Sequence, residues 1–163
     1  MNRLLLVAFG SNVGEREKQV ASAIQTVGAE VGKLLAVSRL YESEPFGVDH
    51  TQPYINAVAA YSTELMPEVV HQFLQEIETQ MGRLSKGDLR PRTIDLDLIA
   101  LGTERCSTSD LTIPHPRMEQ RKFVLHPLAD VVPTWQHPGT KRSVSELLLA
   151  CRDNGWIRPV SWK

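Results

Sequence analysis

Two aspartates with one residue between them, Asp95 and Asp97, are the residues in this sequence whose spacing most directly suggests chemistry. They lie in an apolar run that predicts a strand over residues 93–101. Alternate residues of a strand point to one face, which places their Cα atoms roughly 6.5–7 Å apart. Two anions at the edge of a core are costly, and Mg²⁺ would offset that cost and hold phosphates as well. Taken alone, the pair favours ordinary ion pairs with nearby arginines.

A basic segment directly precedes the two aspartates. Residues 83–92 contain four cations, Arg83, Lys86, Arg90 and Arg92, and one acid, so their net charge is +3 while that of the whole chain is −1. Guanidinium groups bind phosphate oxygens through paired hydrogen bonds. Carboxylates that hold a metal, together with cations that meet developing charge, are what phosphoryl transfer requires. The chain has no G-x-x-x-x-G-K-[ST] motif, so a P-loop is excluded and arginine and metal must bind the phosphates.

A histidine and three polar or aromatic positions extend this pattern. His115 lies between two prolines in a cationic segment over residues 112–123. It could donate a hydrogen bond to a phosphate or a base, or equally bond backbone carbonyls in a turn. Phe46 and Phe123 could enclose a flat heterocycle whose edge Asn56 bonds, although ordinary core packing of both phenylalanines is the competing interpretation.

A small set of elements must position these residues. Apolar runs predict strands over residues 4–9, 33–42, 54–63 and 93–101. Apolar stripes predict one helix over residues 15–27 that Gly28 closes, and a second from Pro67 to Met81 that Gly82 closes. The order β-α-β-β-α-β is typical of an α+β, ferredoxin-like antiparallel sheet with two helices on one face.

The remaining residues are expected to form a C-terminal extension packed onto that sheet. A helical segment interrupted by proline is predicted over residues 123–131. A final helix follows the capping box of Ser143 and Glu146. Trp135, Trp156 and Trp162 are the expected contacts between extension and sheet.

Length and composition limit the class of protein. The 163 residues predict a single domain over residues 1–163, and 42% hydrophobic with 23% charged residues excludes a disordered chain, a collagen and a coiled coil. The near-neutral charge predicts neither nucleic acid nor a membrane as partner. No apolar run resembles a signal peptide or a membrane span, and the distant Cys106 and Cys151 are expected to be reduced thiols. The sequence thus favours a cytoplasmic protein, which we expect to be a monomer that binds small molecules.

Seven short motifs in order resemble the 6-hydroxymethyl-7,8-dihydropterin pyrophosphokinase family of folate biosynthesis. The resemblance extends from residue 9 to about residue 128 and covers most of the chain. The matches are Phe-Gly-Ser-Asn at residues 9–12, Tyr-x-Ser-x-Pro-x-Gly at 41–47, Tyr-x-Asn-Ala at 54–57, Glu-x-x-x-Gly-Arg at 78–83, Pro-Arg-Thr-x-Asp-Leu-Asp at 91–97, Pro-His at 114–115 and Arg-x-Phe at 121–123.

The resemblance implies an ATP-dependent enzyme that transfers the terminal diphosphate of ATP to the hydroxymethyl group of a reduced pterin and leaves AMP. By the same resemblance, Asp95 and Asp97 hold two Mg²⁺ ions, and Arg83 and Arg92 stabilise charge on the transferring group. The implied ATP contacts are Gln75, Glu78, Arg92, Leu98, Thr112, His115 and Arg121. The implied pterin contacts are Ser43, Pro45, Phe46, Tyr54, Asn56 and Phe123.

The chain departs from the family pattern at several positions, mostly near the basic segment. Ser85 stands where relatives commonly carry arginine, Leu89 and Arg90 replace a Trp-Gly pair, and Glu44 and Pro116 replace a proline and an aromatic residue. One alternative is therefore a diverged paralogue that binds pterin or nucleotide without transferring diphosphate. A second is an RNA-binding module, although its aromatic strand motif is missing and the pI is about 6.5.

Overall fold

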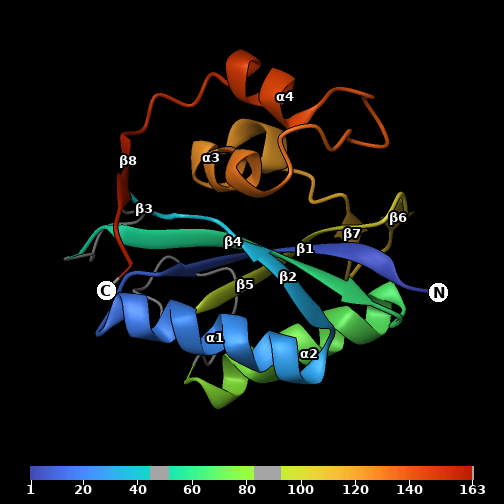
Figure 1. Ribbon diagram of the computed structural model, residues 1–163, viewed down its shortest axis with the longest axis horizontal. Helices are drawn as coiled ribbons and strands as arrows, with labels where there is room; N and C mark the ends of the chain where they lie inside the picture. The colour runs from blue at the N-terminus through green and yellow to red at the C-terminus, as the bar shows by residue number, and fades with distance from the viewer. Residues whose placement is uncertain (45–51, 83–92, 163) are drawn as a thin grey trace.

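An antiparallel sheet forms the centre of the computed structural model, which describes residues 1–44, 52–82 and 93–162 (Figure 1). Its strands are ordered β5-β1-β4-β3-β8, and β2 pairs with β4 as well. The strands of this sheet are β1 (Arg3–Ser11), β2 (Lys33–Val37), β3 (Leu40–Ser43), β4 (Tyr54–Thr63), β5 (Asp95–Leu101) and β8 (Ile157–Val160). The helices are α1 (Arg16–Glu30), α2 (Pro67–Gln80), α3 (Lys122–Val131) and α4 (Val144–Ala150), and a small ladder joins β6 (Cys106–Ser107) to β7 (Thr112–Ile113).

Helices cover both faces of this sheet. Figure 1 shows α1 and α2 on one side and α3 and α4 on the other. Alternate residues of β1 therefore enter two separate cores: Leu5 and Val7 pack toward α1 and α2, while Leu6 packs with residues of α3 and α4. This double coverage explains why β1 is apolar at successive positions instead of alternating with polar residues. The antiparallel sheet and the C-terminal helices packed onto it agree with the sequence-based expectation.

The main differences from the sequence prediction concern the end of α1 and the strand expected over residues 33–42. Helix α1 continues past Gly28 to Glu30, so the prediction that Gly28 closes the helix is wrong. The glycine that the chain requires there is Gly32, because a Cβ at that position would lie 2.5 Å from the carbonyl oxygen of Ser62 on β4. The expected strand over residues 33–42 is divided into β2 and β3, which pair with successive parts of β4.

The C-terminal segment contributes more than the expected helical extension. Strand β8 pairs with β3 and extends the sheet at that edge. The Ser143–Glu146 capping box is present at the start of α4. Trp135 packs against the core on the α3 and α4 side, whereas Trp156 and Trp162 remain 43% and 41% exposed. No helix within the described ranges has the length and apolarity needed to cross a membrane.

Candidate functional site

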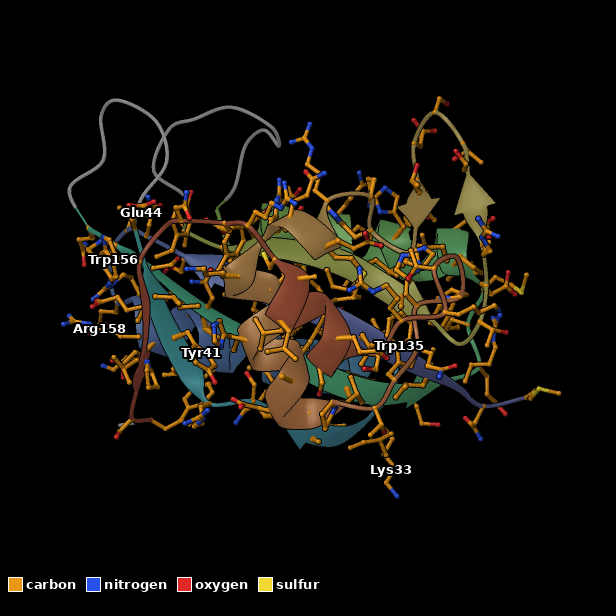
Figure 2. The ribbon with its side chains drawn as sticks, turned by 90° about the horizontal axis from the view of Figure 1, so that it is seen from above. Lys33, Tyr41, Glu44, Trp135, Trp156 and Arg158 are labelled. Carbon is orange, nitrogen blue, oxygen red and sulfur yellow. The ribbon has the colours of Figure 1, made fainter. Side chains whose placement is uncertain are left out.

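A cavity of about 1040 Å³ lies on the side of the sheet that α3 and α4 cover. Gly10 and Asp95 line it from the strands, and Val124 and Leu147 line it from the helices. Figure 2 looks onto these two helices from above, with the strands behind them. The cavity is therefore enclosed by two layers that come from distant parts of the chain.

The register of three central strands determines which polar side chains reach the cavity. Gly10 on β1 is opposite Asn56 on β4 and opposite Asp95 on β5, and Ala8 is opposite Asp97. Directly opposed residues of antiparallel strands point to the same face. The two aspartates and Asn56 consequently share one face, and Gly10 between them leaves room above the sheet because it has no side chain.

The two aspartates form the acidic part of this face. Asp95 and Asp97 both line the cavity, while Leu96 between them is buried on the α1 and α2 side. The carboxylate of Glu78 on α2 accepts a hydrogen bond from the Leu96 backbone nitrogen at 2.8 Å. This bond connects α2 to the short stretch of β5 that carries both aspartates.

The donor set of this stretch fits magnesium. Mg²⁺ in nucleotide sites is commonly held by one or two carboxylates, with water and substrate phosphates completing its shell. Asp95 and Asp97 supply two half-buried carboxylates to a cavity large enough for a nucleotide. Among the described residues no group of three or more His, Cys, Asp or Glu side chains could hold a metal by itself. Any metal here would thus rely on the substrate for its remaining ligands.

A polar cluster on β3 and β4 forms the second part of the cavity. Asn56 is 4% exposed, and its Nδ2 donates to Ser43 Oγ at 2.7 Å and to the Tyr41 carbonyl oxygen at 3.4 Å. Tyr54 is opposite Ser43 in the ladder and lines the same cavity. Phe123 lines it from the beginning of α3. An aromatic ring on one side and amide and hydroxyl groups on the other suit a flat, polar heterocycle.

His115 and Arg121 lie in the segment before α3, and both line the cavity. The His115 backbone nitrogen donates to the Ile99 carbonyl oxygen at 2.8 Å, which ties this segment to β5. Its Nδ1 accepts from the Arg117 backbone nitrogen at 3.1 Å, so in the neutral imidazole Nε2 carries the proton. The guanidinium of Arg121 lies 5.5 Å from the centroid of the Phe123 ring. The backbone of His115 is thus fixed to β5, while the side chains of His115 and Arg121 line the cavity.

The cavity therefore contains eight of the residues singled out in the sequence: Ser43, Tyr54, Asn56, Asp95, Asp97, His115, Arg121 and Phe123. Four others are not among its lining residues: Gln75 and Glu78 are on α2, Leu98 is buried on the α1 and α2 side, and Thr112 is on β7. Arg83, Arg92, Pro45 and Phe46 lie outside the described residues. The roles assigned to all of these residues stay predictions.

A carboxylate that the sequence analysis did not select supports the wall of the polar cluster. Glu42, next to Ser43, accepts hydrogen bonds from Arg158 on β8 and, at 3.0 Å, from Arg16 on α1. Burial raises the pKa of this carboxyl, but the hydrogen bonds from Arg158 and Arg16 outweigh that effect and hold the pKa below its usual value. Arg16 also donates to the Pro53 carbonyl oxygen at 2.7 Å. The partners are 26 and 116 residues from Glu42, so no local pattern indicates them.

Other lining residues also escaped the sequence analysis, among them Arg117, Glu119, Arg142, Arg152 and Asp153. Three of them flank α4, a part of the chain in which spacing predicted only a packed helix. A run of cations near a helix is usually a solvated surface, so the sequence contains no signal that would separate these arginines from ordinary exposed ones.

The sequence of this chain matches a known protein family. The family model described as 7,8-dihydro-6-hydroxymethylpterin-pyrophosphokinase (HPPK) matches residues 6–133. A protein of Porphyromonas gingivalis named 2-amino-4-hydroxy-6-hydroxymethyldihydropteridine pyrophosphokinase is 38% identical over 139 residues, which cover 83% of this chain and 94% of that protein. The Pseudomonas aeruginosa protein of the same name is 39% identical over 158 residues, with 95% and 96% covered.

Solved structures show the same fold in a longer protein. A crystal structure of Plasmodium falciparum HPPK-DHPS with pteroate matches with a TM-score of 0.72 at 14% identity. The match covers 92% of this chain but 42% of the Plasmodium chain, so this chain spans less than half of that protein. At this identity the likeness concerns the fold only.

Proposed function

Because the chain belongs to the 7,8-dihydro-6-hydroxymethylpterin-pyrophosphokinase family, we propose that it is an ATP-dependent diphosphotransferase of folate synthesis. It transfers the terminal diphosphate of ATP to the hydroxymethyl group of 6-hydroxymethyl-7,8-dihydropterin. The observation that carries this proposal is the convergence of Asp95 and Asp97 with Asn56 and Phe123 on one cavity. The family match and the curated relatives favour transfer over a paralogue that only binds its ligands.

The reaction divides between the two parts of the cavity. The hydroxymethyl oxygen of the pterin forms a bond to the β-phosphorus of ATP, and the bond from that phosphorus to the bridging oxygen of AMP breaks. The hydroxyl proton leaves to solvent, and AMP carries away the bonding electron pair. Little covalent chemistry falls to the protein, which accelerates the step by placing the two substrates in line.

Each cavity wall has its own task in this proposal. Ser43, Tyr54 and Asn56 bond the pterin edge while Phe123 covers its ring. Asp95 and Asp97 would hold two Mg²⁺ ions, whose charge would offset that of the triphosphate. His115 and Arg121 contact the nucleotide from the segment before α3. Arg83 and Arg92, outside the described residues, would stabilise the transferring group.

Several finer features belong to the same proposal. We infer a ferredoxin-like topology from the helix and strand order and from the neighbours of β1 and β4. A single domain over residues 1–163, a monomeric state and a cytoplasmic location remain expectations from the sequence.

The direct test is AMP release from ATP, Mg²⁺ and 6-hydroxymethyl-7,8-dihydropterin. The parent protein should form AMP only when all three are present, and Asp97→Ala should abolish it because a metal ligand is lost. Asp110→Ala is the matched control, since Asp110 is an exposed aspartate that does not line the cavity. A parent protein that binds the pterin without releasing AMP would establish the paralogue instead, and full activity of Asp97→Ala would remove the proposed metal site.

A further inference from the structure

Four arginines line the helical side of the cavity. Arg117 and Arg121 line it from the segment before α3, Arg142 from the residue ahead of the α4 capping box, and Arg152 from just beyond α4. Arg142 and Arg152 lie beyond residue 133, where the family match ends. Nothing in the resemblance or in the family match assigns them a role, although they border the same space as Asp95 and Asp97.

The acidic side chains beside these two arginines are already engaged. The Glu146 carboxylate accepts a hydrogen bond from the Ser143 backbone nitrogen at 3.1 Å. Hydrogen bonds from Ser143 are the chief cause of the lowered pKa of Glu146, and the charge of Arg142 contributes to a smaller extent. Asp153 accepts the Lys122 backbone nitrogen at 3.1 Å and the Gly155 backbone nitrogen at 2.9 Å.

The arginines themselves lack such partners within the described ranges. Neither the guanidinium of Arg142 nor that of Arg152 forms an ion pair with a carboxylate of residues 1–44, 52–82 or 93–162. Both side chains are exposed on the cavity wall. Two cations next to satisfied acids can accept an anion without breaking an existing ion pair.

The two arginines approach the cavity from different sides. The carbonyl oxygen of Arg142 accepts a hydrogen bond from the His137 backbone nitrogen at 2.9 Å. His137 Nε2 in turn lies 3.5 Å from a carboxylate oxygen of Glu119. This places Arg142 beside the segment that carries His115. Arg152 precedes Asp153, whose bond to Lys122 places it beside Phe123.

We propose that Arg142 and Arg152 bind phosphate oxygens of the nucleotide, as a cationic wall opposite the aspartates of β5. The identity of the anion rests on the proposed function, and the placement of the two guanidinium groups on the cavity does not. A polyphosphate carries several negative charges, which the carboxylates of Asp95 and Asp97 repel in the absence of a metal. The guanidinium groups supply attraction from the other wall and hold the phosphates through paired hydrogen bonds.

The test measures binding rather than turnover. The probes are the ATP analogue with a methylene group between its α- and β-phosphates, supplied with Mg²⁺, and 6-hydroxymethylpterin, which carries no phosphate. We expect Arg142→Gln and Arg152→Gln each to weaken binding of the analogue about fivefold to tenfold, because each removes one partly exposed charge contact. Binding of the pterin should change less than about twofold in either variant.

A control and a salt series separate phosphate binding from a structural role. Arg105→Gln removes an exposed arginine that does not line the cavity and should leave both affinities unchanged. The dissociation constant of the analogue should depend less steeply on salt concentration in the double variant, because fewer cations face the phosphates. An Arg142→Lys variant should recover part of the lost affinity.

Three results overturn the inference. The first is normal analogue binding in the double variant, and the second is an equal loss of analogue and pterin binding, which would indicate a disturbed wall. The third is a parent protein that binds no nucleotide. A parent protein that binds the analogue but releases no AMP from ATP contradicts the proposed function alone and leaves the cationic wall in place.

Discussion

The hydroxyl of Tyr41 on β3 donates a hydrogen bond to Asp130 Oδ2 on α3 at 2.8 Å. Arg39 donates to the same carboxylate from Nε at 3.2 Å and from Nη2 at 3.1 Å, and it also donates to the Tyr41 hydroxyl. Strand β3 ends at Ser43, and α3 begins with the turn that contains Phe123. This cluster therefore connects the two walls between which the pterin is proposed to bind.

We expect Tyr41→Phe to lower stability by about 1 kcal/mol, the net contribution of one hydrogen bond, and to weaken pterin binding severalfold. Tyr41 is 3% exposed, and burial together with the bond to Asp130 raises its pKa to about 12, so the phenol is a donor throughout any ordinary assay. Its loss weakens the connection between α3 and β3, which then depends on the hydrogen bonds from Arg39 to Asp130. Urea unfolding and pterin titration measure the two effects.

Tyr61→Phe is the matched control for that variant. The Tyr61 hydroxyl donates to the Ile24 carbonyl oxygen at 2.9 Å on the opposite side of the sheet. The Tyr61→Phe variant should lower the free energy of unfolding by a similar amount and leave pterin affinity unchanged. If both variants weaken pterin binding equally, the Tyr41–Asp130 contact has no specific role in positioning the walls.

Acidification should destabilise the protein partly through Glu42. Hydrogen bonds from Arg158 and Arg16 hold its pKa below the usual value despite the opposing effect of burial. A carboxyl group whose pKa is lower in the folded state stabilises the fold above its unfolded pKa, and this contribution disappears as the pH falls toward the folded value. Glu42→Gln should be less stable than the parent at neutral pH by about 1.5–3 kcal/mol, the range for hydrogen bonds to charged groups.

The measurement for Glu42 is urea unfolding at several pH values between about pH 6 and pH 3. The parent should lose more free energy of unfolding over this range than Glu42→Gln, because the variant has no Glu42 carboxylate to protonate. Asp130, whose pKa is also lowered, is present in both proteins and cancels from the comparison. Glu30→Gln, an exposed change at the end of α1, is the control, and its free energy of unfolding should depend on pH as that of the parent does. The same pH dependence in the parent and in Glu42→Gln would contradict the role of the Glu42 carboxylate.

Local spacing was sufficient to predict several features of this fold. The strand expected over residues 54–63 has those bounds as β4, and the capping box at Ser143 forms at the start of α4. The shared face of Asp95 and Asp97 also follows from their spacing alone. In each case the deciding interaction lies within a few residues along the chain.

Features that depend on distant contacts could not be predicted in this way. The pairing of β8 with β3 joins residues more than 100 positions apart, and Arg152 follows a helix, α4, that packs with α3 beside the cavity. Gly28 resembles a helix terminator locally, but packing of α1 on the sheet extends the helix beyond it. Tertiary packing outweighed local propensity at these positions.

Glu78→Ala should impair the site although Glu78 does not line the cavity. Its carboxylate accepts the backbone N–H of Leu96, which lies between Asp95 and Asp97. Losing this hydrogen bond to a buried N–H should lower the free energy of unfolding by about 1–3 kcal/mol and reduce turnover by disturbing both aspartates. Glu78→Gln keeps an acceptor oxygen and should recover most of both properties. Equal defects in the two variants, measured by unfolding and AMP release, would show that the charge matters rather than the hydrogen bond to Leu96.

Gly10→Ala should obstruct the cavity without disturbing the fold. A Cβ at Gly10 would lie 3.5 Å from Asn56 Oδ1 and 3.7 Å from Tyr54 Cδ1, which are ordinary van der Waals distances. The free energy of unfolding should therefore change by less than about 1 kcal/mol, and a small gain would reflect the lower entropy of the unfolded chain.

Ligand binding should nevertheless weaken in Gly10→Ala. The added methyl group lies between Asn56 and Asp95, where the proposed pterin and phosphate sites meet, and should weaken binding of the pterin about fivefold or more. Gly28→Ala, on the opposite side of the sheet, is the control. Its Cβ would lie 3.9 Å from Leu34 Cβ, and the variant should bind the pterin as the parent does. Calorimetric titration with pterin distinguishes the two. Unchanged affinity in Gly10→Ala would mean that the substrates do not approach the sheet at Gly10. They would then have to bind closer to α3 than proposed.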